Sequence, residues 1–195
     1  MIVVPEKCLT FLFLKFSVMH TCPAITKPTS DEYPEWFAEE IERVYYNDLI
    51  TGLQDSLNKT LNFLRKLTDE DIVYRYAPGK WSIKQMWQHV IDVERVLSYR
   101  ALRYARKDET VLPGFDENKY AAVSNADHRN FKDIIREYAV VRDSTLELFR
   151  SFTEAMFFHR GTAGKSNMTV RSVGYLILGH EIHHVNTIKE RYLKR

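Results

Sequence analysis

The sequence predicts an all-α protein: a single-domain four-helix bundle with long loops after the second and third helices. Four stretches place apolar residues at steps of three and four, which is the period of an amphipathic helix. No stretch of similar length alternates between polar and apolar residues, so no sheet is expected. Of the 195 residues, 45% are hydrophobic and 28% are charged, which suits one domain with a substantial core.

Each helix is expected where an apolar stripe continues over several turns. The expected helices cover about residues 48–67, 82–107, 127–151 and 169–193. Ser82 follows a Pro-Gly turn and is the expected N-cap of the second helix, and Thr169 is the expected cap of the fourth. The third helix shows the rhythm most clearly, with Phe131, Ile134, Tyr138, Val141, Thr145, Leu148 and Phe152. Four helices of this length are what a bundle requires.

The connection after the second helix has about 20 residues and includes the segment VLPGFDENKY, whereas the next has about 17 and includes RGTAGKSN. Loops of this length are commonly functional or disordered. The first is the candidate wall of a substrate pocket, with Asp116 and Tyr120 as substrate contacts. The alternative is a structural loop that Pro113 and Phe115 pack in place.

Residues 1–29 are expected to be an extension that is either untranslated or disordered, and residues 30–195 to be the bundle domain. An apolar run that begins at Cys8 is too short to span a bilayer. A lysine interrupts the run and no A-x-A site follows it, so a start at Met19 is favoured over a secretory signal. Cys8 and Cys22 both lie in the extension, and a domain without cysteine indicates a reducing, cytoplasmic setting.

The charge distribution argues against nucleic acid as a partner. The formal net charge is +2, and basic residues are interleaved with acidic ones rather than forming a one-sided stripe. Nothing in the domain resembles a transmembrane segment, so no membrane partner is expected. Arg100 and Arg103 could bind a carboxylate or phosphate if they face a pocket, although solvated arginines are commoner near a helix C-terminus.

The apolar stripe of the fourth helix contains two histidines. Its members are Val173, Ile177, His180, His184 and Ile188, at steps of four, three, four and four. Residues four apart on a helix have Cβ atoms about 6 Å apart, so two imidazoles at this spacing can converge on one metal ion. His183 lies about 100° around the helix and is expected at the rim or in solvent.

A third histidine, His89, lies at the edge of the stripe of the second helix. It is about 10 Å into that helix, and His180 is about 17 Å into the fourth. If these two helices run parallel, as in an up-down-up-down bundle, the three imidazoles of His89, His180 and His184 meet inside the bundle. The alternative is that each is a core histidine satisfied by a hydrogen bond.

His180, Glu181 and His184 also spell H-E-x-x-H, the pattern of zinc proteases. Those proteases commonly take a third ligand from downstream, and few residues follow His184, so a protease is disfavoured. Glu181 is a candidate general base. Solvent exposure, or a hydrogen bond that supports a ligand, is the favoured alternative for Glu181.

Four segments together resemble the DinB-like family, in particular its branch of YfiT-type metal-dependent hydrolases and bacillithiol-transferase relatives. They are YRYAPGKWSIKQMWQHVIDVERVLSYRALRYAR, LPGFDENKY, RGTAG and GHEIHHVNTIKERYL. The resemblance implies a four-helix bundle in which three histidines hold a divalent metal ion, and the matching positions are His89, His180 and His184.

Zinc and nickel both suit three imidazoles. The resemblance implies that the protein is a metal-dependent hydrolase or a thiol S-transferase acting on a small molecule. The alternative is a non-catalytic, stress-related bundle whose metal stabilises the fold or assists a homodimer.

Overall fold

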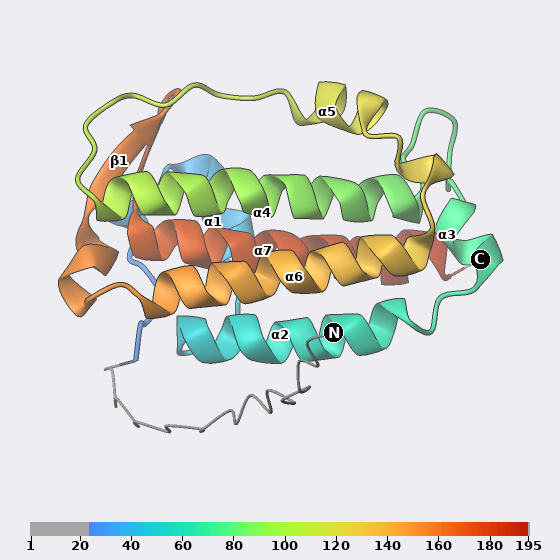
Figure 1. The fold of residues 1–195 in the computed structure, drawn as a ribbon, viewed down its shortest axis with the longest axis horizontal. Helices are drawn as coiled ribbons and strands as arrows, with labels where there is room; N and C mark the ends of the chain where they lie inside the picture. Colours follow the sequence, from blue (N-terminus) through green and yellow to red (C-terminus); the bar gives the residue numbers. More distant parts are fainter. Residues whose placement is uncertain (1–23, 195) are drawn as a thin grey trace, which may run out of the picture.

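The computed structural model describes residues 24–194, and four long helices dominate it (Figure 1). They are α2 (Leu49–Leu64), α4 (Ile83–Ala105), α6 (Phe131–Arg150) and α7 (Val170–Thr187), which continues into a π-helical turn (Ile188–Tyr192). The predicted helical class is thus confirmed. The shorter helices are α1 (Ala38–Glu42), α3 (Asp69–Val73) and α5 (Glu117–Val123). Turns of 3-10 helix cover Ser30–Glu32, Glu35–Phe37, Ala126–His128 and Glu154–Phe158.

The strictly all-α prediction is wrong at one place, the connection between α6 and α7. Strands β1 (Arg160–Ala163) and β2 (Ser166–Thr169) pair there as an antiparallel hairpin. Its two-residue turn begins at Gly164, whose φ of +58° is readily available only to glycine. The other long connection is also partly ordered, because it contains α5.

Side-chain caps fix where the helices begin. The Ser82 hydroxyl accepts a hydrogen bond from the backbone of Gln85, and Thr169 accepts one from the backbone of Ser172, so both predicted caps are confirmed. Helix α6 begins later than the expected residue 127. The Asn130 side chain caps its first turn, and the residues before it form a separate 3-10 turn.

Helices α4 and α7 pack against each other in opposite directions, so the expectation that they run parallel is wrong (Figure 1). The Tyr192 hydroxyl at the end of α7 donates to the Trp81 carbonyl just before α4, at 2.8 Å. At the opposite end of the bundle, His159 Nδ1 donates to the carbonyl of Ala105, and the His159 carbonyl accepts from Val170. Long connections allow this arrangement because they do not force successive helices to alternate in direction.

The apolar core consists of two clusters separated by a belt of buried polar groups. One cluster is built around Tyr104 and Phe149, and the other around Trp87 and Tyr138. Between them, the fully buried Arg142 forms ion pairs with Glu94 at 2.8 Å and with Glu181 at 2.7 Å. The hydroxyls of Ser56 and Thr60 donate to Glu181 as well. This belt, hereafter the ion belt, links α2, α4, α6 and α7 at mid-height.

Ile25, near the start of the described residues, packs against the bundle. Ile25 is buried, its backbone nitrogen donates to Asp48 at 2.9 Å, and its carbonyl accepts from the Tyr175 hydroxyl at 3.0 Å. The expectations for the apolar run and for a start at Met19 fall outside the described residues. Within residues 24–194, the helices are all too short or too polar to cross a bilayer.

Candidate metal centre

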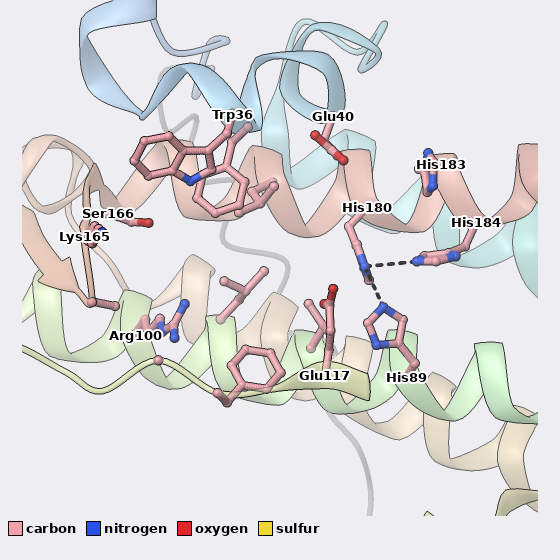
Figure 2. Close-up of a pocket in the computed structure, with 18 of the residues that line it drawn as sticks. Trp36, Glu40, His89, Arg100, Glu117, Lys165, Ser166, His180, His183 and His184 are labelled. Carbon is pink, nitrogen blue, oxygen red and sulfur yellow. Dashed lines mark hydrogen bonds between the residues drawn. The ribbon is translucent and has the colours of Figure 1, made fainter. Parts of the chain in front are cut away.

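Three imidazoles, two from α7 and one from α4, converge between these helices (Figure 2). The Nε2 atom of His180 lies 3.1 Å from Nε2 of His89 and 3.1 Å from Nε2 of His184. One ligand atom from each of the three residues lies within 4.8 Å of the others. The structure therefore brings together the three residues that the sequence singled out.

The antiparallel packing explains why these residues meet. The hydrogen bond between Tyr192 and Trp81 sets the two helices in register at one end of the bundle. His184 lies eight residues before Tyr192, and His89 lies eight residues after Trp81. Both imidazoles are thus about 12 Å from that shared end. His180 is one further turn along α7 and completes the cluster.

The spacing of the nitrogens fits a divalent metal ion. Ligands at 2.0–2.1 Å from a tetrahedral centre are separated by about 3.3 Å, close to the two distances of 3.1 Å that involve His180. Imidazole nitrogens that face one another cannot all carry protons, so lone pairs are directed into the space between them. Nδ1 of the buried His184 has no hydrogen-bond partner among the described residues, which leaves this ring free to adjust around an ion.

The electrostatics keep the cluster neutral, which is the form that binds metal. Burial, followed by the charge of His183, lowers the pKa of His89 to about 4. Burial and the neighbouring histidines also lower the pKa values of His180 and His184 well below the usual value for histidine. Three neutral imidazoles without a further protein ligand leave at least one coordination position for a substrate or solvent.

The three histidines line one end of a cavity of about 570 Å³. Helices α4 and α7 form its floor, where the apolar side chains are Val93, Leu97 and Leu176. Its walls come from outside the bundle: the segment around α1, the segment that leads into α5, and the β1–β2 hairpin. His183, expected in solvent or at the rim, also lines this cavity.

The connection after α4 does form a cavity wall, but through residues other than those expected. Gly114, Phe115 and Glu117 line the cavity. Asp116 instead caps α5 by accepting from the backbone of Lys119. Tyr120 is 47% exposed and its ring packs against Phe115, so neither Asp116 nor Tyr120 is part of the lining.

Glu181 is only 1% exposed, so the solvated alternative is wrong. It follows His180 in the chain but points to the other side of α7, where its carboxylate joins the ion belt. It does not line the histidine cavity, and Arg142 and Ser56 occupy its oxygens, which does not suit a general base acting at the histidines.

Two carboxylates near the histidines were missed by the sequence analysis. Glu117 and Glu40 both line the cavity, and Figure 2 shows their side chains extending into it from opposite walls. Burial, together with the charges of Asp116 and Glu40, raises the pKa of Glu117. The only sequence signal was that Glu117 lies inside the loop predicted to form the pocket wall.

The fold and site thus define a helical bundle in which three histidines that fit a divalent metal ion face a cavity. The chain belongs to the DinB superfamily, whose family model matches residues 53–188. The resemblance inferred from the sequence is confirmed.

Two known proteins are similar to this chain. A protein of Oceanobacillus iheyensis named "Putative metal-dependent hydrolase" is 29% identical over 96 residues, which is 49% of this chain. The match covers 47% of that protein, so this chain aligns with about half the length of the curated relative. The structure of YfiT from Bacillus subtilis is described as "a probable metal-dependent hydrolase with an unusual four-helix bundle topology". It matches with a TM-score of 0.66 and 18% identity, over 73% of this chain and 82% of YfiT, and this likeness shows the fold.

Proposed function

We propose that the protein is a metal-dependent hydrolase of a small molecule. The observation that carries the proposal is the convergence of three imidazole Nε2 atoms at the end of a cavity large enough for a small ligand. A purely structural ion is normally enclosed by four protein ligands, whereas three ligands beside a cavity match the arrangement of catalytic sites. The names of the two relatives point to the same class of activity.

The proposed roles of the chain's own groups follow from their positions. His89, His180 and His184 hold the ion, for which zinc and nickel are both suitable. A divalent ion held there would supply Lewis-acid chemistry, polarising a substrate carbonyl and lowering the pKa of water to about 7. The Glu117 carboxylate, which lines the cavity, accepts a proton from the attacking water and returns it to the leaving group, and burial raises its pKa. Val93 and Leu97 exclude water from the floor of the cavity.

The test combines metal analysis with hydrolysis assays. Purified protein should contain about one equivalent of zinc or nickel and should hydrolyse members of a panel of esters and amides. The double variant His180→Ala/His184→Ala should lose both the metal and the activity. The matched control is His128→Ala, because His128 is exposed and lies outside the cavity.

Other outcomes separate the alternatives. Absence of metal after reconstitution, or activity that survives in the double variant, would overturn the proposal. Metal binding with transfer of a thiol to an electrophile, and without hydrolysis, would assign the site to thiol S-transfer. Metal binding that only raises the melting temperature would assign the ion a structural role.

A further inference from the structure

The end of the cavity farthest from the histidines carries unneutralised positive charge. Arg100, Lys165 and Ser166 line this end, and Figure 2 shows them grouped away from the three imidazoles. Arg100 lies eleven residues after His89 on α4, which corresponds to about 16 Å along the helix. Val93 and Leu97 lie between them on the same face, so an apolar floor connects the two ends.

Arg100 has few polar partners. Its guanidinium stacks over Phe115 at 5.7 Å, and one nitrogen donates to the Pro113 carbonyl at 3.3 Å. Burial lowers the pKa of Arg100, and no ion pair joins it to any carboxylate in residues 24–194. By contrast, Arg103 pairs with Asp108. A guanidinium has five donors in a planar fork, so most of the hydrogen-bonding capacity of Arg100 is directed at the cavity and its opening.

The β1–β2 hairpin adds a second cation and a hydroxyl. Lys165 is the exposed second residue of the hairpin turn, and Ser166 opens β2. The hairpin register pairs Ala163 with Ser166, so Gly164 and Lys165 form the turn, and both line the cavity. The flexible side chain of Lys165 can therefore pair with an anion that Arg100 binds in a fixed orientation.

The two ends of the cavity differ in charge. Glu40 and Glu117 lie at the histidine end, and Arg100 and Lys165 lie at the other. An anionic group on a ligand is repelled by the carboxylates and attracted by the cations, so the cavity imposes one orientation on it. The neutral, apolar middle suits a hydrocarbon or aromatic spacer.

We propose that Arg100 and Lys165 form an anion-binding subsite, and that the substrate is an elongated molecule with a carboxylate or phosphate at one end and a hydrolysable acyl group at the other. The part of this proposal that concerns the acyl group rests on the proposed hydrolase function. In that reaction water adds to the acyl carbon, the bond to the leaving group breaks, and the leaving group takes up the proton. Arg100 holds the distal anion and places the acyl carbon at the three histidines.

The kinetic test uses aryl esters of straight-chain diacids, from succinic to dodecanedioic acid, beside their neutral ω-methyl esters and their ω-phosphate analogues. The value of kcat/KM should be greatest at one chain length and should exceed that of the neutral ester by about tenfold to a hundredfold. Arg100→Gln should remove this preference, mainly through KM, while Arg100→Lys should restore part of it. Arg103→Gln, three residues along α4, is the matched control and should keep the preference. The ω-carboxylate and ω-phosphate series show which anion fits.

A binding measurement separates failure of the subsite from failure of the hydrolase proposal. Calorimetric titration with the half-amides of the same diacids, which are charged at one end only, should show binding to the wild type and to His180→Ala/His184→Ala, and at least tenfold weaker binding to Arg100→Gln. Equal rates for charged and neutral esters, or equal affinity in Arg100→Gln, would overturn the subsite. Half-amide binding without hydrolysis of any ester would support the subsite and overturn the hydrolase function.

Discussion

Replacing Arg142 with methionine should destabilise the protein more than any other single change in the ion belt. The guanidinium is fully buried and makes two hydrogen bonds of 2.8 Å to Glu94 and an ion pair of 2.7 Å with Glu181. Methionine fills a similar volume but leaves two buried carboxylates without a counter-ion. Each of them must then stay charged without a cation or take up a proton, and both outcomes cost free energy.

The size of the effect follows from the number of groups left unpaired. Removing one partner of a buried ion pair costs about 3–5 kcal/mol, and two abandoned carboxylates place Arg142→Met near the upper end of that range. For a domain of this size, about 5 kcal/mol lowers Tm by about 10–20 °C. Replacing Glu94, Arg142 and Glu181 together by methionine should recover most of the loss, because apolar groups need no counter-ion.

Thermal and urea denaturation followed by circular dichroism provide the assay. The matched control is Arg136→Met on the same helix, since Arg136 is 75% exposed and pairs with the exposed Asp133. That change should cost less than about 0.5 kcal/mol. If the free energy of unfolding of Arg142→Met lies within 1 kcal/mol of that of the control, the account of the ion belt is refuted.

Three further predictions concern the packing, the acid response and the metal. Gly179→Ala should lower the free energy of unfolding by at least about 2 kcal/mol, because the new Cβ would lie 2.0 Å from the Glu40 carbonyl oxygen. In the control Gly114→Ala, the new Cβ meets no atom within 4 Å, so this free energy should hardly change. Burial raises the pKa of Glu32, but hydrogen bonds, chiefly from Arg171, outweigh this and lower it from 4.5 to about 2. Glu32 therefore contributes stability that is present above about pH 4.5 and is lost as the pH falls towards 2. At neutral pH this contribution to the free energy of unfolding is about 3 kcal/mol. Glu32→Gln should therefore be less stable at pH 7, and its free energy of unfolding should fall less steeply as the pH is lowered. Zinc or nickel at about a thousand times its Kd should raise the free energy of unfolding by about 4 kcal/mol in calorimetry, a gain that a chelator reverses and that is absent without the two α7 histidines.

The sequence was sufficient to predict the residues of the histidine cluster. His180 and His184 lie four apart on a stripe whose burial follows from its apolar neighbours, and this local geometry survives any arrangement of the bundle. The direction of α4 relative to α7 was not predictable, because a long connection permits either. His89 reaches the cluster from the opposite direction to that expected, since the contact of Tyr192 with Trp81 sets the register.

The rest of the site depends on tertiary packing that periodicity does not encode. Glu40 and Glu117 come from short helices outside the bundle, and the hairpin strands are too short for an alternating pattern to be recognised. Arg142 was overlooked because the apolar stripe of α6 is defined by its hydrophobic members, and a charged residue beside Val141 is expected at the surface. Asp116 caps α5, a role that the sequence analysis did not consider for this residue, since an acidic residue before a helix is well suited to capping it.

The cavity has a floor made by long bundle helices and walls made by the connections between them. The histidines and the cavity walls that contact a ligand are therefore encoded in separate stretches of sequence. Insertions or exchanges in residues 111–117 or 160–169 can change which molecules are accepted without moving the imidazoles, because those residues contribute none of the histidines. During evolution, the reaction is expected to stay the same while the substrates that are accepted change. In protein design, the two connections can be replaced while the histidines are kept.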